Sequence, residues 1–159
     1  MRRQRKSWLE KLNDDKDLPR VVNIEGRLSK YWGEGTLVIP APREVDELMR
    51  KVSRGKVVTI NHLRAVLAMR HGTTIACPIT TGIFARIAAG AATEDEAAGR
   101  KLITPYWRIL KGEGELNPKY PGGCEGQRDR LEAEGHTIIQ KGKKFLVKDY
   151  KKYLAEIEP

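Results

Sequence analysis

The chain has 159 residues and a mass of 18.0 kDa, a length that suits one domain with a single hydrophobic core. It carries 30 Lys and Arg against 21 Asp and Glu, which gives a formal charge of +9 and a pI near 9.7. This basic balance predicts attraction to a polyanion such as nucleic acid or an anionic membrane surface. Hydrophobic residues make up 40% of the chain, which argues against disorder, and no apolar run is long enough to cross a bilayer.

Cysteine usage and the first residues of the chain indicate the compartment. Cys77 and Cys124 have no CxxC spacing, which disfavours a disulfide framework and a structural zinc site. Residues 1–6 lead into polar sequence rather than into the apolar segment of a signal peptide. We therefore expect a cytoplasmic protein, nucleoid-associated in a prokaryote, that inserts into no membrane and uses no metal or cofactor.

The first 42 residues predict an N-terminal arm with short strands. Charged residues alternate up to about residue 20 around Trp8, Leu9 and Leu12, which indicates one short amphipathic helix at the periphery. Apolar runs at 21–24 and 36–39 indicate two strands, because a polar stretch with three glycines separates them.

Three helices are predicted between residues 43 and 89. Apolar residues at helical spacing indicate a helix over 43–54. Thr59 suits the cap of a second helix that ends near residue 70, and Pro78 suits the first turn of a third helix over 78–89. A helix, a short turn and a second helix rich in small residues favour a helix-turn-helix. Two core helices of an ordinary α+β domain are the alternative.

The remaining segments predict a separate acidic helix and a C-terminal hairpin. Residues 93–96 match the capping box and begin a solvent-exposed acidic helix that ends near Gly99. A loop at 120–123 precedes a helix over 127–134. Segments 136–140 and 144–147 predict a β-hairpin, followed by a short lysine-rich helix from Lys148.

Several motifs in one order resemble the alkylguanine-DNA alkyltransferase family. They lie at residues 104–110 (TPYWRIL), 112–116 (GEGEL), 120–123 (YPGG) and 131–136 (LEAEGH), with GKVVT at 55–59 upstream. The resemblance implies an α/β, mostly helical fold: a winged helix-turn-helix DNA-binding domain like the C-terminal domain of those enzymes, with short strands and a C-terminal β-hairpin. It divides the chain into an arm at 1–42, the winged-helix domain at 43–136, and a hairpin with a basic helix at 137–159 that belongs to the same fold.

The residues at the family's reactive site differ in this chain. Family enzymes take an alkyl group from guanine onto a cysteine thiolate, activated through a histidine that a glutamate orients. Here Tyr106 stands at the cysteine position and Trp107 at the histidine position, whereas Arg108 and Glu134 match the family. A phenol is a poor nucleophile toward alkyl carbon, and indole supplies no base. The resemblance therefore implies a non-enzymatic member, similar to the alkyltransferase-like proteins that bind alkylated DNA without repairing it.

Two groups of site residues follow from the resemblance and from the charge pattern. The predicted nucleic-acid contacts are Thr80, Thr81, Arg86, Lys111 and Lys119. The predicted base pocket, whose aromatic faces would stack on a modified or displaced base, consists of Pro105, Tyr106, Tyr120, Pro121 and Gly122. Trp107, Arg108 and Glu134 are expected to have structural roles. Plain core packing is the alternative for the three aromatic residues.

Base flipping is in question, because two positions that serve it in the family differ. Ile60 stands where the family has a tyrosine that rotates the target nucleotide, and Ile79 lies near the position of the intercalating arginine. Arg86, two turns further along the same helix, is a candidate substitute. A basic patch near the C-terminus either contacts phosphate or is simply a solvated surface; its members are Lys141, Lys143, Lys144, Lys148, Lys151 and Lys152.

The predicted function is a non-catalytic, monomeric DNA-binding protein that recognises alkylated or otherwise modified bases in duplex DNA. Its expected partners are duplex DNA and, as a second class, repair proteins. Two alternatives stay open: a protein-interaction module on a reused fold, and a divergent enzyme that uses Cys77 near a helix N-terminus. Structural roles are expected for Cys124 and for the three histidines, His62, His71 and His136.

Overall fold

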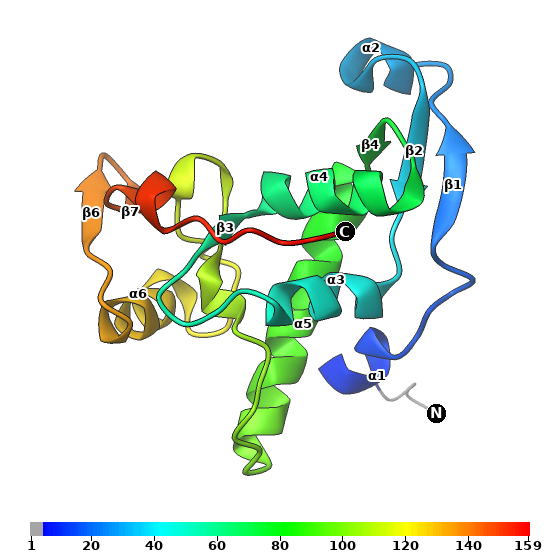
Figure 1. Ribbon diagram of the computed structural model, residues 1–159. Helices are drawn as coiled ribbons and strands as arrows, with labels where there is room; N and C mark the ends of the chain where they lie inside the picture. Colours follow the sequence, from blue (N-terminus) through cyan, green and yellow to red (C-terminus); the bar gives the residue numbers. More distant parts are fainter. Residues whose placement is uncertain (1–4) are drawn as a thin grey trace.

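A long central helix organises the fold. In the computed structural model, which describes residues 5–159, α5 (Pro78–Ala97) is contacted by α1 (Trp8–Leu12), α3 (Pro42–Arg50) and α4 (Ile60–His71) (Figure 1). Small side chains let helices approach closely. The inward face of α5 is accordingly built from Ala85, Ala88, Ala89, Ala91 and Ala92, all of them buried.

Three small sheets fix where the helices begin. β2 pairs antiparallel with β1 and parallel with β4, β3 pairs parallel with β5, and β6 and β7 form a hairpin. β3 leads directly into α4, and β4 leads through Cys77 into α5. The strands are β1 (Arg20–Asn23), β2 (Thr36–Ile39), β3 (Val58–Thr59), β4 (Ile75–Ala76), β5 (Ile109–Leu110), β6 (Ile138–Lys141) and β7 (Lys144–Val147).

Short helices fill the connections between these elements. α2 (Leu28–Trp32) lies at the tip between β1 and β2, where Figure 1 shows it projecting from the body, and α6 (Gly123–Ala133) precedes the hairpin. Three 3-10 segments are η1 (Tyr106–Arg108), η2 (Gly112–Gly114) and η3 (Tyr150–Tyr153). None of the helices along residues 5–159 has both the length and the apolar character needed to cross a bilayer.

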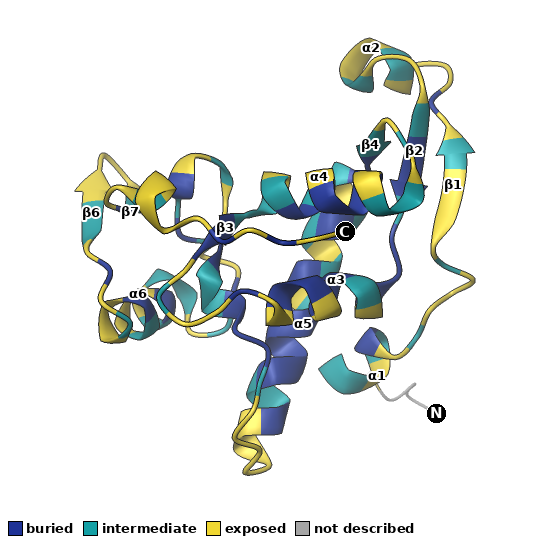
Figure 2. Cartoon of the chain, viewed as in Figure 1, coloured by how far each residue is buried: buried dark blue, intermediate teal, exposed yellow. Residues whose placement is uncertain are grey.

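The hydrophobic core consists of one main cluster and two smaller ones. The main cluster joins α1, α3, α4 and α5 to the C-terminal residues Ala155 and Ile157. A second cluster beneath the hairpin includes Leu116 and Leu131, and a third at the β1–β2 sheet contains Cys77. Figure 2 shows the dark, buried middle of α5 between the exposed α2 and the exposed hairpin.

Most of the predicted elements are confirmed. α3 and α4 form where apolar spacing indicates them, and the Thr59 hydroxyl accepts a hydrogen bond from the His62 amide at 3.2 Å, so the predicted cap is present. Gly72 ends α4 with a left-handed φ of 64°, a conformation that costs glycine little. The hairpin forms as predicted, whereas the helix over 127–134 begins earlier, at Gly123, and the lysine-rich helix is the 3-10 segment η3.

The prediction of a separate acidic helix at 93–99 is wrong, because α5 continues without a break to Ala97. The Thr93 hydroxyl donates to the carbonyl of Gly90 at 2.7 Å instead of capping a new helix. Buried Ala91, Ala92 and Asp95 prolong the inward face of α5, so core packing overrides the local capping signal.

The prediction that the first helix is peripheral is also wrong. Leu12 is buried in the main cluster, and the ring of Trp8 lies against Gly90, where a Cβ atom would come within 2.3 Å of it. The backbone N–H of Trp8 donates to the Glu94 side chain at 2.6 Å, so a residue of α5 satisfies a free backbone N–H in the first turn of α1. Glycine at position 90 makes this close contact possible, and α1 is part of the core.

Candidate nucleic-acid interface

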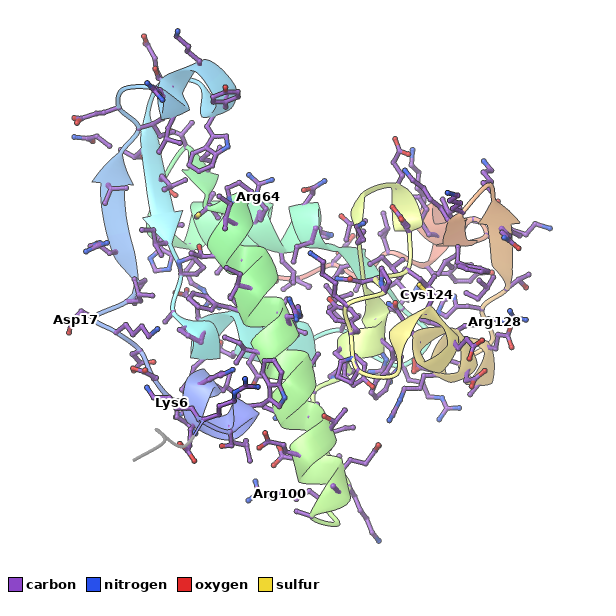
Figure 3. The ribbon with its side chains drawn as sticks, turned by 180° about the vertical axis from the view of Figure 1, so that it is seen from behind. Lys6, Asp17, Arg64, Arg100, Cys124 and Arg128 are labelled. Carbon is purple, nitrogen blue, oxygen red and sulfur yellow. The ribbon has the colours of Figure 1, made fainter. Side chains whose placement is uncertain are left out.

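A groove runs between the first half of α5 and the loops that follow β5. Its volume is about 340 Å³, and Figure 3 views α5 from behind with these loops beside it. The groove brings together three predicted contact residues, Arg86, Lys111 and Lys119. Its full lining is Ile79, Gly82, Ile83 and Arg86 from α5 with Lys111, Asn117, Pro118 and Lys119 from the loops.

The charge of the groove is positive and largely uncompensated. Arg86 and Lys119 are exposed, and across residues 5–159 neither lies within ion-pair distance of a carboxylate. Lys111 is 3.7 Å from Glu115 in an exposed pair, which contributes little to stability. All three cations therefore remain available to an anion.

The helix side of the groove is apolar, and a glycine, which has no side chain, lies next to its two exposed isoleucines. Ile79 and Ile83 are 61% and 49% exposed, one turn apart, and Gly82 lies beside them. A Cβ at Gly82 would have no neighbour within 4 Å, although glycine inside a helix costs roughly 0.5 to 1 kcal/mol relative to alanine. No contact within the described chain therefore requires a glycine at this position.

Thr81 does not contact this groove, which corrects the sequence prediction. It is completely buried, and its hydroxyl donates to the carbonyl of Cys77 at 2.6 Å. Helical geometry puts Thr81 on the same face as Ala85 and Ala88, and that face is the core. Thr80 is half-buried and does not line the groove either; its hydroxyl is shielded and has no hydrogen-bond partner in the described chain. The predicted contact residues did not include Ile83 and Gly82. The signal for them was that they follow Ile79 at helical spacing, on the face of the helix opposite the buried alanines.

Tyr106 and Tyr120 are core residues. They are 2% and 4% exposed, and their ring centroids lie 5.7 Å apart edge to face. Trp107 packs edge to face on Tyr106 at 5.3 Å. The open base pocket predicted from the sequence is therefore corrected to an aromatic cluster. Pro105 lines a separate shallow hollow beside Trp107, and Gly122, after Pro121, begins α6 with a φ of 82°.

An arginine closes this aromatic cluster from the α6 side. The guanidinium of Arg130 lies 4.6 Å from the Trp107 ring centre and 5.6 Å from that of Tyr106, and it pairs with Glu96 at 2.7 Å. Burial raises the pKa of the Tyr106 phenol, and nearby Arg130 offsets only part of that effect. Burial also raises the pKa of Tyr120. Both phenols are therefore neutral at physiological pH and are not nucleophiles.

Glu134 connects Trp107 and Arg108 to the loop at Gly55. Its carboxylate accepts hydrogen bonds from Trp107 Nε1 at 2.5 Å, from Arg108 Nε at 2.7 Å and from the Gly55 amide at 3.1 Å. Burial alone would raise the pKa of Glu134, but the hydrogen bonds from Arg108, Trp107 and Gly55 outweigh it, so the pKa lies below its usual value. The carboxylate stays ionised and ties η1 to α6, which is a structural role.

Two solved structures resemble this chain. S. pombe Atl1 in complex with damaged DNA containing O6-carboxymethylguanine is 19% identical with a TM-score of 0.50, and S. pombe ATL in complex with DNA is 20% identical with a TM-score of 0.53. Each comparison covers 72% of this chain and 94% of the other. The chain has the fold of the alkyltransferase-like proteins. No protein-family model matches it, and no curated protein sequence does.

The cysteines of this alkyltransferase-like fold occupy structural positions. Cys77 is buried with Ile24 and Leu37, at the residue before α5. Burial raises the pKa of the Cys124 thiol, with nearby Glu115 adding to the rise, which disfavours the reactive thiolate. Among residues 5–159, no group of three His, Cys, Asp or Glu side chains is placed to hold a metal ion.

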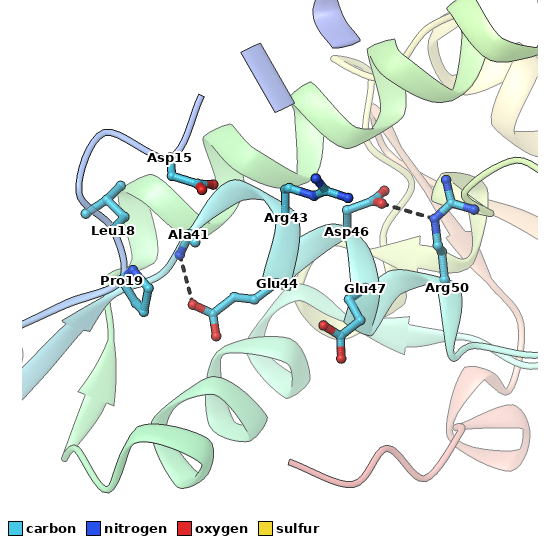
Figure 4. Close-up of a pocket in the computed structure, with 9 residues that line it drawn as sticks. All are labelled: Asp15, Leu18, Pro19, Ala41, Arg43, Glu44, Asp46, Glu47 and Arg50. Atoms are coloured by element: carbon cyan, nitrogen blue, oxygen red, sulfur yellow. Dashed lines mark hydrogen bonds and ion pairs between the residues drawn. The ribbon is translucent and has the colours of Figure 1, made fainter. Parts of the chain in front are cut away.

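A further hollow of the alkyltransferase-like fold lies away from the groove, over α3. It measures about 580 Å³, and its carboxylates are already engaged by the chain itself (Figure 4). Glu44 accepts from the Ala41 amide at 2.9 Å, and Asp46 pairs with Arg50 at 3.0 Å. Asp15 and Glu47 add further negative charge. Four carboxylates against two arginines, Arg43 and Arg50, leave the lining with a net negative charge, which disfavours phosphate.

Proposed function

We propose that this protein is a non-catalytic binder of duplex DNA that recognises alkylated or otherwise modified bases, and that the groove on α5 is its contact surface. The observation that carries the proposal is the groove itself: three available cations, Arg86, Lys111 and Lys119, flank an exposed apolar helix face around Gly82. The two neighbours of the same fold are complexes with DNA, one of them with O6-carboxymethylguanine.

In this proposal the two sides of the groove have different tasks. The cations contact phosphates, which supplies affinity without sequence information. Ile79 and Ile83 meet the base edges and sugars of a DNA groove, where apolar side chains can wedge between base steps. The unit formed by α4, the turn at 72–77 and α5 then serves as the helix-turn-helix, with the hairpin β6–β7 as its wing.

Recognition of a modified base would require the aromatic cluster to open. Arg130 covers Trp107 and Tyr106, and its ion pair with Glu96 is partly exposed. An exposed pair is worth only about 0 to 1 kcal/mol, so displacement of Arg130 by an extrahelical base costs little from this source. Stacking on an aromatic ring gains roughly 1 to 3 kcal/mol per base.

The absence of catalysis follows, in this proposal, from the replaced reactive pair. The Tyr106 phenol is buried and neutral, and the Trp107 indole donates its only N–H to Glu134. Neither side chain can act as a base toward a nucleophile. The alternative of an enzyme that uses Cys77 lacks support, because that thiol is buried in the third cluster.

The test is duplex binding measured by fluorescence anisotropy over a series of salt concentrations, with plain and O6-alkylguanine duplexes. Arg86→Glu and Lys119→Glu should each weaken binding to both duplexes, whereas the control variants Lys51→Glu and Lys56→Glu, which carry the same charge change outside the groove, should not. The slope of log K against log salt should be about −0.9 for each phosphate contacted. Affinity that is independent of salt would contradict the proposal and favour the protein-interaction module.

A further inference from the structure

A second basic cavity lies on the C-terminal hairpin. It measures about 520 Å³, and its lining includes Lys141, Lys148, Lys151 and Lys152. Lys152 is 3.8 Å from Asp149, whereas the other three have no carboxylate within ion-pair distance among residues 5–159. Two carboxylates, Glu113 and Asp149, also line the cavity, so four ammonium groups face two carboxylates and the lining has a net positive charge.

The strand register explains how the hairpin forms this cavity. Ile138 and Val147 are paired, and with Phe145 they face the second core cluster. Because side chains alternate across a strand, Ile139 and Leu146 face the other way and form an apolar floor. Lysines at 141 and 148 lie two residues further along the same face, so they stand at the edge of that floor.

The cavity is adjacent to the α5 groove. Lys111, immediately before η2, lines the groove, whereas Glu113, inside η2, lines the cavity. Figures 1 and 3 agree that the loops after β5 lie between α5 and the hairpin. The two basic depressions are therefore neighbours, with lining residues two positions apart in the same loop.

The connection between the two depressions is tightly packed. The ring of Tyr150 lies so close to Gly114 that a Cβ there would come within 2.5 Å of it. The Leu116 amide also donates to the carbonyl of Phe145 at 2.8 Å. η2, η3 and the hairpin are thus joined by close contacts, and a ligand that spans both depressions would meet a preformed surface.

We propose that the cavity on the hairpin is a second phosphate-binding site for the same duplex that the α5 groove contacts; this inference rests on the proposed function. Sugar and phosphate suit the cavity, because deoxyribose can lie on the floor formed by Ile139 and Leu146 while the lysines contact phosphate oxygens. The adjacency of the groove favours DNA over an acidic protein segment as the occupant. The hairpin then extends the duplex footprint beyond α5.

The experiment removes the three uncompensated charges from the full chain. Lys141→Gln, Lys148→Gln and Lys151→Gln are combined, and binding of plain duplex is measured over a series of salt concentrations. We expect the slope of log K against log salt to become less steep by about 1 for each lysine that contacts a phosphate. The control combines Lys51→Gln, Lys56→Gln and Lys101→Gln, which removes the same charge elsewhere and should leave the slope unchanged. Melting temperatures verify that both triple variants are folded.

Three results would overturn the inference in distinguishable ways. If the triple variant keeps the slope of the control while Arg86→Glu lowers affinity, the hairpin is not a phosphate site and the proposed function stands. If the triple variant keeps that slope but loses binding to a polyglutamate peptide that the parent chain binds, the occupant is an acidic protein segment. If the parent chain shows no salt-dependent binding of duplex, the proposed function fails and this inference fails with it.

Discussion

At the scale of single residues, Glu134 shows how one carboxylate can join three segments of the chain. The sequence resemblance aligns it with a glutamate that orients a histidine, whereas in the structure it accepts hydrogen bonds from an indole, a guanidinium and a backbone amide. None of these three donors changes its protonation state near neutral pH. The same carboxylate therefore stabilises the fold by joining η1 and the Gly55 loop to the end of α6.

Glu134→Gln should lower stability by about 1 to 3 kcal/mol at pH 7, because an amide N–H would face the donors of Trp107 or Arg108. Folding lowers the pKa of Glu134, so the unfolded chain binds the proton more readily. The stabilisation is complete above about pH 4.5, the usual value for a glutamate, and is lost as pH falls through the lower pKa of the folded state. Urea unfolding at a series of pH values should show the wild-type advantage shrinking below pH 4.5. An advantage that is constant down to acid pH would contradict this account of the carboxylate.

At the scale of elements, α5 has two faces that serve different purposes. Its alanine face and Gly90 let α1, α3 and α4 pack closely, whereas Gly82 and the two isoleucines face outward into the groove. The two glycines lie two turns apart and differ only in what surrounds them. Substitution of each glycine by alanine therefore distinguishes the effect on helix packing from the effect on ligand contact.

Gly82→Ala should stabilise the fold by roughly 0.5 to 1 kcal/mol, because alanine favours the helix and meets open space. Gly90→Ala should instead destabilise it by about 1 to 3 kcal/mol, since the new methyl group meets the Trp8 ring. Thermal melts measure both effects. In the proposed function, Gly82→Ala also weakens duplex binding despite the gain in stability. Unchanged affinity would show that no ligand approaches α5 closely at this residue.

The sequence predicts these elements better than it predicts their environments. Apolar periodicity and caps identify α3, α4, the start of α5 and the hairpin, because those signals are local. The end of α5 and the burial of α1 depend on contacts between residues more than 80 positions apart, such as that of Trp8 with Glu94. The burial of Tyr106 depends likewise on α6, which supplies Arg130. Lys111 and Lys119 were predicted as contacts because they are charged residues in a loop, and they do line the groove. Their exposure does not depend on distant contacts.

At the scale of the whole molecule, the distribution of charge agrees with the proposed function. The chain has a net charge of +9, and lysines and an arginine line the α5 groove and the cavity on the hairpin. The hollow over α3 is instead lined by four carboxylates and two arginines. A positive surface on one part of a molecule orients it toward a polyanion. In the proposed function, α5 and the hairpin therefore face DNA, whereas the hollow over α3 does not contact it.

The surrounding fold also determines whether a single substitution is enough to give the protein alkyl-transfer activity. Tyr106→Cys places a cysteine at the position that resembles the nucleophile of the alkyltransferases, but we expect no alkyl transfer from an O6-alkylguanine duplex, because Trp107 supplies no base and an apolar site keeps a thiol protonated. None of the three histidines can replace that base: His136 packs against Tyr153 at 5.0 Å, His71 pairs with Glu44 at 2.7 Å, and His62 lies on α4. Intact-protein mass spectrometry after incubation checks this for the wild type and the variant.

Two controls make the mass measurement decisive. A thermal melt shows whether the variant is folded, since loss of a buried aromatic side chain costs roughly 3 to 5 kcal/mol, and anisotropy with the same duplex shows whether it binds. A mass increase of one alkyl group in the variant alone would mean that the site needs no histidine to activate a thiol. An increase in the wild type, located by peptide mapping to Cys77, would restore the enzyme alternative, because a thiol buried before α5 would then have reached the alkylated base.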